Sequence, residues 1–497
     1  MSSNQVLTPI LIPWITGIVL IFFYKNIWIQ RFLSGFSAVL ALGNAMYLLI
    51  TVSKSGTIVF WAGGWVPPFG ITMVVDLLTA VFVLTTSVTS FAVILYSFRS
   101  IDEQRSLHFY YFLVQMMLVG VNGAFITGDI FNLYVFFELF LISSYVLMAI
   151  GSTQGQLRET YKYVILNVIV STFFLVGLAL LYGVSGTLNM ADLARKLPLA
   201  ENQGIISLIA VIFIVVFGSK AAVFPLFYWL PRSYAEPPAA ISAIFCVLTK
   251  VGIYCLIRAF TLIFTGDAVF MNSLLFTLGA CTMVLGGLGA VSQYNFKRML
   301  SYDLVSQVGY TVMALAISNT VAIMAAIYFA IHNIVVKSGL FLFAGVTEEI
   351  TGTNDLRLMG GLLHRYPLLG WGFFMGALSL VGIPPFSGFF AKLLMLSGAS
   401  DAGNYLAMFV TLGVGLLTLF AMIKIFVYCY WGEVKPVRQE ALEHSFNYRL
   451  YMLPCLFLVL ISIMMGLGAE YVIGIIQRAA EEIQNPELYI RAVLGTT

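Results

Sequence analysis

Charged residues, cysteines and histidines are all scarce in this sequence. Of its 497 residues 9% are charged, 5 are cysteine and 4 are histidine, and the formal net charge is +3. The basic residues are dispersed, so they form no surface suited to nucleic acid. The cysteines lie inside apolar runs without metal-ligand spacing, which argues against disulfides and iron–sulfur ligation. The sequence also lacks a phosphate-binding glycine loop and a histidine pair spaced for haem, so we expect no metal and no cofactor.

Long apolar runs take the place of charge. Hydrophobic residues make up 60% of the chain, and the mean hydropathy is +0.97. A helix needs about 20 apolar residues to cross a bilayer, and runs of that length recur from end to end. The sequence therefore predicts an all-α polytopic membrane protein with about 14 transmembrane helices. The predicted spans are 8–24, 31–52, 71–97, 109–127, 129–150, 161–183, 204–230, 238–262, 271–292, 301–318, 320–346, 367–396, 403–431 and 449–477.

The connections between most predicted spans are short, so we expect no soluble domain. The chain divides into residues 1–108 with three helices, 109–262 with five, 271–431 with five more, and 449–497 with the last helix and a tail. Basic residues concentrate in the loops on one side, and the positive-inside rule then places both termini outside. The first apolar run is followed by no cleavage site, so we expect it to be retained as a span.

The two five-helix segments share short matches in the same order. Because five is odd, the second copy enters the membrane from the opposite side, which predicts inverted repeats of helices 4–8 and 9–13. The matches are Gly120, Gly123 and Ala124 with Gly286, Gly289 and Ala290; Phe137-Glu138-Leu139 and Tyr145 with Tyr302-Asp303-Leu304 and Tyr310; Gly186-Thr187 with Gly352-Thr353; and Lys250 and Tyr254-Cys255 with Lys424 and Tyr428-Cys429.

A few ionisable residues stand inside the apolar runs. A charge costs several kcal/mol to hold in hydrocarbon, so such residues by default mark an ion or proton pathway. Lysine suits a proton relay because its proton affinity changes readily on burial, whereas arginine stays charged. The candidates for a proton pathway are Glu138, Lys220, Lys250, Lys337, His332 and Lys392.

Two of the predicted spans carry a helix break next to a lysine. Proline lacks the amide that bonds back into a helix. In the seventh span Lys220 precedes Pro225, and in the twelfth Pro384 and Pro385 precede Lys392. Inverted-repeat transporters place their ion sites at such breaks near the bilayer midplane. We therefore predict that helices 7 and 12 are broken, and that a lysine accompanies the break at the same place in both copies.

Some of these residues also have a purely structural interpretation. Glu138 and Lys337 would then only hold helices together by hydrogen bonds, and the long side chain of Lys392 would extend toward the membrane interface. We favour the pathway for Glu138 and Lys392, because charges in mid-span are usually functional. For Lys337 both interpretations stay open.

Further polar residues in the spans are secondary candidates. Asp303, Ser306, Gln307 and Tyr310 repeat at helical spacing and must face protein or water rather than lipid. This stripe either lines a water path or, at Asp303, ends in a salt bridge to a basic residue of the preceding loop.

Three more residues stand apart from this stripe. Tyr254 follows Lys250 at helical spacing and extends its polar face. Lys424 lies near the end of its span, where we favour extension to the interface. Asp76 lies early in the third helix, and we expect it to pair with a basic group on a neighbouring helix.

These features resemble the antiporter-like subunits shared by Mrp-type cation/proton antiporters and the membrane arm of respiratory complex I. The resemblance covers nearly the whole chain and rests on fourteen helices in inverted repeats, on Phe137-Glu138, and on Lys220 before a proline. It implies that Glu138 and Lys220 form a coupled pair, that Lys250 connects, and that Lys392 is the outer terminal group. The length and the lysine at 392 resemble the D-type subunits of Mrp antiporters.

The resemblance also implies partners and a location. We expect a hetero-oligomeric complex with other Mrp subunits in a bacterial cell membrane, with lipid around it and with protons and Na+ as the transported ions. The first functional hypothesis is therefore a proton-translocating subunit of a cation/proton antiporter, which is not an enzyme. The alternative is a proton-pumping membrane subunit of a complex I-like or hydrogenase-like redox complex, whose cofactors would lie in partner chains. A scaffold is a third hypothesis, but a scaffold gains little from two broken helices.

Overall fold

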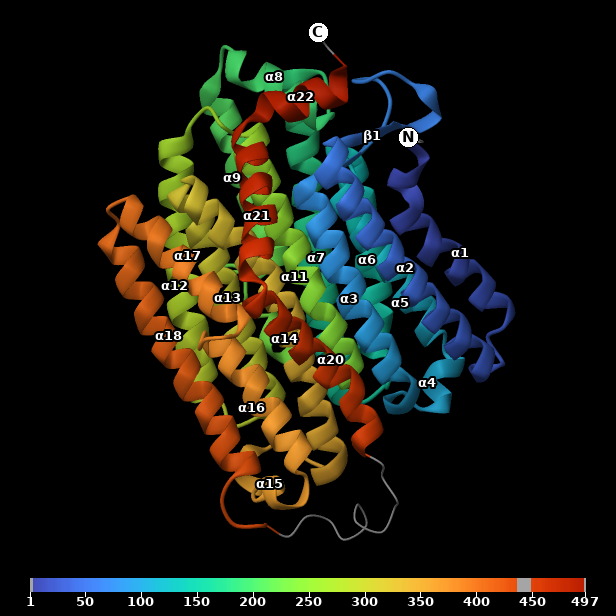
Figure 1. The fold of residues 1–497 in the computed structure, drawn as a ribbon. Coiled ribbons are helices and arrows are strands. Elements are labelled where there is room, and N and C mark those ends of the chain that lie inside the picture. Colours follow the sequence, from blue (N-terminus) through green and yellow to red (C-terminus); the bar gives the residue numbers. More distant parts are fainter. Residues whose placement is uncertain (1–2, 436–447, 496–497) are drawn as a thin grey trace.

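The computed structural model describes residues 3–435 and 448–495, and nearly all of these lie in helices of one bundle (Figure 1). In the described part, twelve helices are long and apolar enough to cross a membrane. Two shorter apolar helices, Tyr110–Ile126 and Pro367–Val381, complete the fourteen predicted spans. Both ends of the chain lie at the same end of the bundle (Figure 1), as expected for an even number of crossings. Most of the predicted polar loop 432–448 lies outside the described residues.

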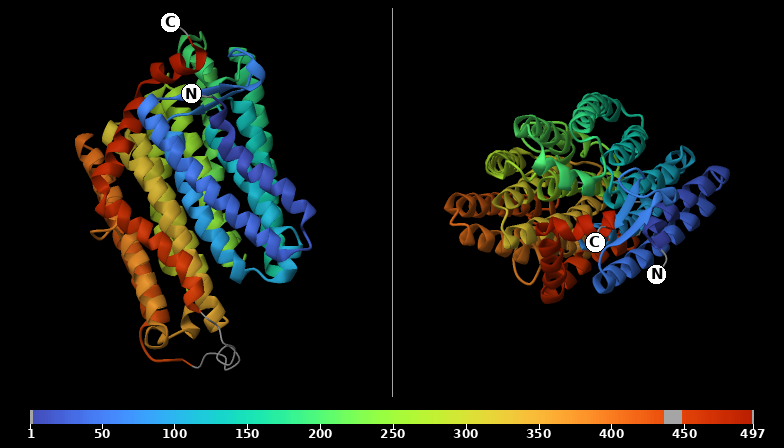
Figure 2. Two further views of the ribbon diagram at one scale, coloured as in Figure 1. Left: turned by 45° about the vertical axis from the view of Figure 1, so that its right-hand side comes forward. Right: turned by 90° about the horizontal axis from the view of Figure 1, so that it is seen from above.

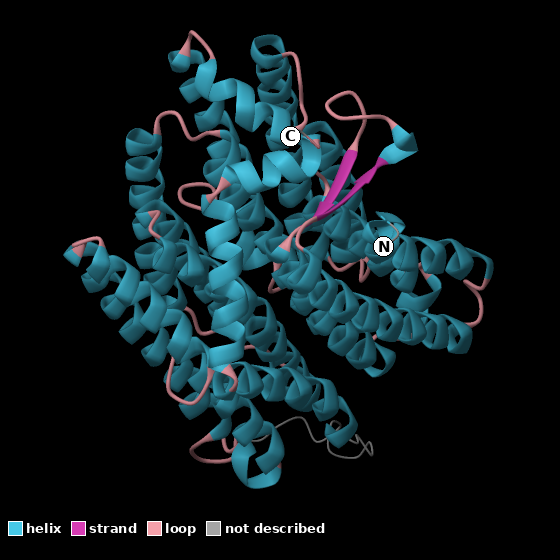
Figure 3. Ribbon diagram, turned by 45° about the horizontal axis from the view of Figure 1, so that its top comes forward, coloured by secondary structure: helices cyan, strands magenta, loops and turns pink. Residues whose placement is uncertain are grey.

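The first hundred residues form three long helices and a hairpin. Residues 72–75 were predicted to begin the third helix, but they form a strand that pairs antiparallel with Ile58–Trp61, with Ile58 opposite Val75. The helix begins only after Asp76, whose side chain accepts a hydrogen bond from the Thr79 amide and caps it. The hairpin lies near both termini, across the end of the helices (Figure 3). The elements are α1 Thr8–Phe22, α2 Ile27–Ser55, β1 Ile58–Trp61, β2 Thr72–Val75, α3 Leu77–Ser100 and α4 Glu103–Leu107.

The five-helix segments follow with their predicted breaks. Helix 7 ends at Ala221 and continues only as a short turn of helix, and helix 12 is interrupted between Val381 and Ser387. The first copy contains α5 Tyr110–Ile126, α6 Ile130–Ala149, α7 Gln154–Ser185, α8 Met190–Lys196, α9 Gln203–Ala221, α10 Leu230–Ser233 and α11 Ala239–Arg258. The second contains α12 Ala268–Ser292, α13 Phe296–Ile317, α14 Thr320–Thr351, α15 Leu362–Arg365, α16 Pro367–Val381, α17 Ser387–Asp401 and α18 Tyr405–Ile425.

The last predicted span is two helices, not one. The first of them ends at Leu467 and the second begins at Ala469, so the predicted helix 449–477 was too long. The reason lies in Gly466, because a Cβ there would overlap the Pro385 carbonyl oxygen. The chain thus passes very close to the break in helix 12. The elements are α20 Tyr448–Leu467, α21 Ala469–Gln484 and α22 Pro486–Leu494.

The two copies are related by a constant offset of 166 residues. Asp129 caps α6, and Asn295, which follows it by 166 residues, caps α13. Asp129 forms an isolated bridge with Asn189, and Asn295 forms the same bridge with Asp355. Helices α7 and α14 begin and end with this offset as well. The duplication predicted from short matches is therefore present along the whole of both segments.

The constant offset corrects the register of two predicted matches. It pairs Asp303 with Phe137 rather than with Glu138, and it pairs Lys424 with Arg258 rather than with the predicted lysine. Short matches slip in this way because apolar helices contain many similar tripeptides. The glycine match is in register: a Cβ on Gly286 would overlap the Ser306 amide nitrogen, as one on its counterpart would crowd α6.

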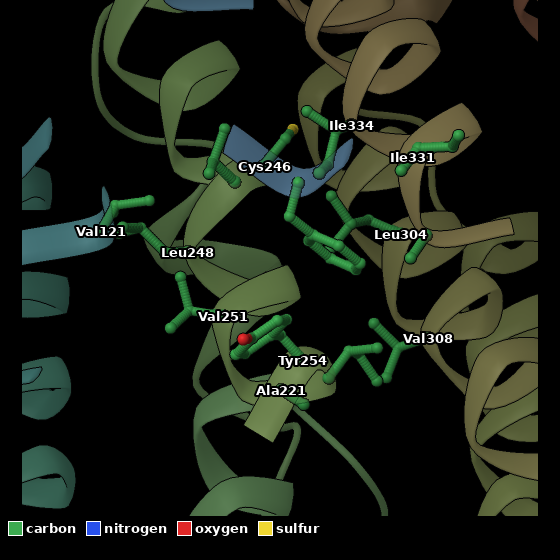
Figure 4. Packing of buried hydrophobic residues seen from close by; sticks show 14 of the residues in the cluster. Val121, Ala221, Cys246, Leu248, Val251, Tyr254, Leu304, Val308, Ile331 and Ile334 are labelled. Carbon is green, nitrogen blue, oxygen red and sulfur yellow. The ribbon is translucent and has the colours of Figure 1, made fainter. Parts of the chain in front are cut away.

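Three helices, α11, α13 and α14, occupy the middle of the bundle. In the most apolar window of each span 89% or more of the residues are buried, whereas α12 and α18 on the outside reach 39% at most. Figure 2 shows the outer helices around these three from above. Leu248 and Val251 of α11 pack near Leu304 and Val308 of α13 (Figure 4). Charges on these helices are therefore held away from lipid.

Candidate functional site

The first copy joins Glu138 and Lys220 through a serine. The Ser171 hydroxyl of α7 donates to Glu138 Oε1 at 2.5 Å, and Lys220 Nζ lies 3.5 Å from Ser171 Oγ. Lys220 Nζ also donates to Asn167 Oδ1 at 2.9 Å. The lysine is only 5% exposed, in the last turn of α9. Glu138 and Lys220 are thus neighbours, as the resemblance implied, but α7 supplies the link between them.

Lys250 lies alone on the central helix α11. It is 1% exposed, and its Nζ lies 3.4 Å from the Thr249 hydroxyl. Among the residues that the structure describes, it has no carboxylate within ion-pair distance. Burying an amine without an acidic partner is costly, so this position is poorly suited to a fixed charge.

Lys337 and Asp303 form an ion pair in the second copy, and neither side chain is exposed. The Thr418 hydroxyl donates to the other carboxylate oxygen of Asp303 at 3.2 Å. The alternative salt bridge to the preceding loop is wrong, because Lys297 pairs with Glu348 at 2.6 Å instead. Asp303 therefore faces the bundle interior and not the end of α13.

Lys220 and Lys392 share a relationship to their breaks that the sequence did not reveal. Lys220 precedes its break in α9, whereas Lys392 follows its break in α17, so the two are not at the same place in the copies. The ammonium of Lys392 nevertheless reaches back and donates to the Val381 carbonyl, the last of α16, at 2.5 Å. Each ammonium thus lies at the carboxyl end of a half-helix, where unpaired carbonyls favour a cation.

His332 lies on α14 beside the break in helix 12. It is 1% exposed, and its Nδ1 lies 2.8 Å from the Ser387 hydroxyl at the start of α17. Gly388 lies against the ring, since a Cβ there would come within 3.1 Å of His332 Nε2. The histidine is therefore held next to the first turn of α17.

The remaining stripe of α13 has mixed roles. Gln307 Nε2 lies 3.4 Å from Thr418 and extends the surroundings of Asp303. The Tyr310 hydroxyl donates to the Thr411 carbonyl at 2.9 Å, and Lys392 Nζ lies 5.8 Å from the Tyr310 ring centre. Ser306 only donates to the backbone of α12. Two of the three residues therefore border the second-copy lysines.

Asp76 and Tyr254 lie together near one end of the bundle. Asp76 pairs with Arg258 at 2.6 Å, which is the basic partner expected on a neighbouring helix. The Tyr254 hydroxyl donates to the Phe125 carbonyl at 2.6 Å and accepts from Arg258 at 3.1 Å. Lys424 caps α12 by donating to the carbonyls at its carboxyl end, 2.8 and 2.9 Å away. These contacts hold helix ends in place.

Cavities of about 190 Å³ open at both ends of the bundle. One lies below α22 and is lined by Asp76, Arg258 and Glu482. The other lies beside α4 and is lined by Lys297 and Glu348. The central helices connect the two, so water has a polar place to enter at each end.

Several residues of the site were missed in the sequence. Asn167 and Ser171 follow one another at helical spacing in an apolar span, which is a signal that could have been found. Ser387 and Ser462 carried no such signal, because a single serine in a membrane helix is common. Each matters only through the side chain that faces it.

Inverted repeats with interrupted helices, and a buried row of ionisable side chains beside them, define a class of membrane protein typical of secondary transporters. Comparison with known proteins agrees with this class. The family described as "NADH:quinone oxidoreductase/Mrp antiporter, TM" matches residues 127–418. The chain belongs to this family of membrane subunits.

Individual relatives cover the whole chain. The chain is 48% identical to the D-type subunit of the Na(+)/H(+) antiporter of Alkalihalophilus pseudofirmus, over 99% of both proteins. It is 42% identical to the D-type subunit of the Na(+)/H(+) antiporter of Bacillus subtilis, again over 99% of both. Among solved structures, a chain of the Mrp complex from Dietzia sp. DQ12-45-1b superposes with a TM-score of 0.92 at 30% identity, with full coverage of both chains.

Proposed function

We propose that this chain is a proton-translocating subunit of a multi-subunit Na+/H+ antiporter. One observation carries the proposal: Lys220 and Lys392 each hold an ammonium at the carboxyl end of a half-helix inside the bundle. Such ends stabilise a cation without a fixed negative charge, so the ammonium can give up its proton without leaving a buried anion. That property suits a transfer step better than a permanent ion pair does.

The transfer starts at the first pair. Glu138 and Lys220 share the Ser171 hydroxyl, which can donate to one and accept from the other. A proton that leaves Lys220 weakens the attraction of Glu138 for it, so the two groups change charge together. This coupling makes Lys220 the proton donor or acceptor and Glu138 the group that tunes it.

The path continues through the central helices. Lys250 on α11, Lys337 on α14 and then His332 provide successive titratable groups toward Lys392. Water is the partner that buried polar atoms take when protein offers none. Four such atoms border this route within the described residues: Ser219 Oγ, Gln307 Oε1, Asn333 Oδ1 and Thr411 Oγ1. Protons would pass between the titratable groups through water at these atoms.

The partners and ions follow from the relatives. Their names specify Na+/H+ antiport and a D-type subunit, and the solved structure is an Mrp complex. This chain would accordingly work as a transporter subunit rather than an enzyme, next to other Mrp subunits in a bacterial cell membrane. The concentration of basic residues on one side places both termini outside.

The test is transport by the complete complex in inverted membrane vesicles of a strain that lacks other Na+/H+ antiporters. Proton movement is followed with a pH-sensitive dye after Na+ is added. Glu138→Ala and Lys220→Ala should each abolish the signal, while the amount of assembled complex stays unchanged. Lys424→Met is the matched control, because it also removes a lysine from a span but only one that caps α12. It should transport nearly as well as the unchanged protein.

Normal antiport in Lys220→Ala would overturn the proposal. A loss of antiport in all three variants would also count against it, because removal of any lysine charge would then suffice.

A further inference from the structure

A row of three buried serines runs from His332 around the break in helix 12. Ser387 Oγ lies 2.8 Å from His332 Nδ1, and Ser462 Oγ lies 2.8 Å from Ser387 Oγ. Ser379 Oγ then lies 2.6 Å from Ser462 Oγ. All three serines are fully buried. The row therefore links four side chains by three consecutive hydrogen bonds.

These four residues come from four different helices. His332 is on α14, Ser387 on α17, Ser379 on α16 and Ser462 on α20. Helix α20 belongs to neither five-helix copy, so the chain after the repeats supplies the middle member of the row. A serine hydroxyl has one proton to donate and two lone pairs that accept, so each can take a proton from one neighbour and pass its own to the next.

Close packing at glycines puts the serines in line. Gly466 lies one helical turn after Ser462 and on the same face of α20. A Cβ on Gly466 would overlap the Pro385 carbonyl oxygen, and one on Gly388 would overlap the Ser379 carbonyl oxygen. Side chains larger than hydrogen at these positions would push α20 and α17 away from the break. The two glycines therefore set the spacing that the hydroxyl row requires.

The far end of the row lies where Lys392 binds. Ser379 and Val381 are both in the last turn of α16, and Lys392 Nζ donates to the Val381 carbonyl. One end of the row thus meets the histidine, and the other meets the half-helix end that holds the lysine.

We propose that Ser387, Ser462 and Ser379 form a hydroxyl relay that carries protons between His332 and the end of α16 beside Lys392. This inference rests on the proposed function. A proton added at His332 moves as a shift along the row: His332 gives a proton to Ser387, Ser387 passes its own to Ser462, and Ser462 passes its own to Ser379. Ser379 releases one proton at the α16 end, and the hydroxyls rotate back. No net charge stays on a serine.

Helix α20 then has a role in transport through a single residue. Buried serines often do no more than hold membrane helices together. A purely structural row predicts that loss of Ser462 lowers stability but leaves the proton-transfer step unchanged. A relay predicts slower proton transfer in a complex that is still assembled.

The experiment compares Ser462→Ala with Ser462→Thr in the complete complex. Removing one positioned proton donor slows transfer by about tenfold to a hundredfold, at the low end for acid–base groups. We expect that loss of rate for Ser462→Ala, together with a larger ratio of rates in H2O and D2O, because the proton hop then limits turnover. Ser462→Thr keeps a hydroxyl and should restore the ratio seen in the unchanged protein.

The matched control is Thr347→Val. Thr347 lies on α14 as His332 does, is fully buried, and shares a hydrogen bond of 2.9 Å with the Tyr430 hydroxyl. It is about 22 Å along the helix from His332, at 1.5 Å per residue. Its loss should leave the rate and the isotope ratio unchanged.

The outcomes separate the two proposals. If Lys220→Ala abolishes antiport while Ser462→Ala transports at the full rate with an unchanged isotope ratio, the relay is wrong and the proposed function stands. If Lys220→Ala transports normally, the proposed function itself fails. Equal losses in Ser462→Ala and Ser462→Thr would also overturn the relay, because the hydroxyl would then not be the group that matters.

Discussion

Ser171 and Lys337 occupy equivalent positions in the two copies, 166 residues apart, yet they carry different chemistry. Ser171 is a neutral hydroxyl between Glu138 and Lys220, while Lys337 is itself the charge that pairs with Asp303. The first copy therefore separates its acid from its base by one hydroxyl, and the second copy joins them directly. A separated pair changes protonation more easily than a joined one, because less Coulomb energy opposes it.

The bridging hydroxyl of Ser171 should matter for transport. Ser171→Ala removes the group that Glu138 and Lys220 share, so we expect the antiport rate to fall by about tenfold, as for a lost positioned proton donor. Ser171→Thr keeps the hydroxyl and should retain most of the rate. The control is Ser143→Ala, since Ser143 is buried on α6 but donates only to the Leu139 carbonyl. Equal rates for Ser171→Ala and the control would contradict this role.

The ion pair of Asp303 and Lys337 should dominate the stability of the second copy. Removing one partner leaves a buried charge unpaired, which costs about 3–5 kcal/mol. Asp303→Leu and Lys337→Met should therefore each lower the amount of assembled protein and its melting temperature in detergent. The double variant removes both charges and should be more stable than either single one. A double variant that is as unstable as the sum of the two would show that the pair has no mutual compensation.

The cap and ion pair of Asp76 can be tested separately. Asp76→Asn keeps an oxygen that accepts from the Thr79 amide but removes the charge that faces Arg258. Asp76→Ala removes both, so it should be less stable than Asp76→Asn by about 1 kcal/mol, the usual value of a helix cap. The measurement is thermal unfolding of the detergent-solubilised complex, with the two variants side by side. Identical melting temperatures would mean that the cap contributes nothing.

Gly286 should tolerate no side chain. A Cβ there would overlap the Ser306 backbone nitrogen, so α12 and α13 must separate. Overpacking of this kind costs about 1–3 kcal/mol, and we expect Gly286→Ala to reduce the assembled protein in the membrane. Gly43→Ala is the control, because no atom lies within 4 Å of a Cβ built on that exposed residue of α2. Its level should match that of the unchanged protein or exceed it.

Much of the architecture followed from local properties of the chain. A span is recognised by the length of its apolar run, a break by a proline that lacks an amide, and an embedded charge by its apolar neighbours. Each of these signals lies within one short stretch of sequence. The sequence by itself therefore determined the membrane spans, the two broken helices and the set of candidates Glu138, Lys220, Lys250, Lys337 and Lys392.

Only the tertiary structure decided which of these side chains meet. Lys337 faces Asp303, and Ser462 reaches the break in helix 12 from outside both copies. Such contacts depend on how each helix is rotated and on how closely glycines let it approach its neighbour. A single serine or lysine is the same in the sequence whichever way its helix turns. The partners therefore emerge only when all the helices are packed together.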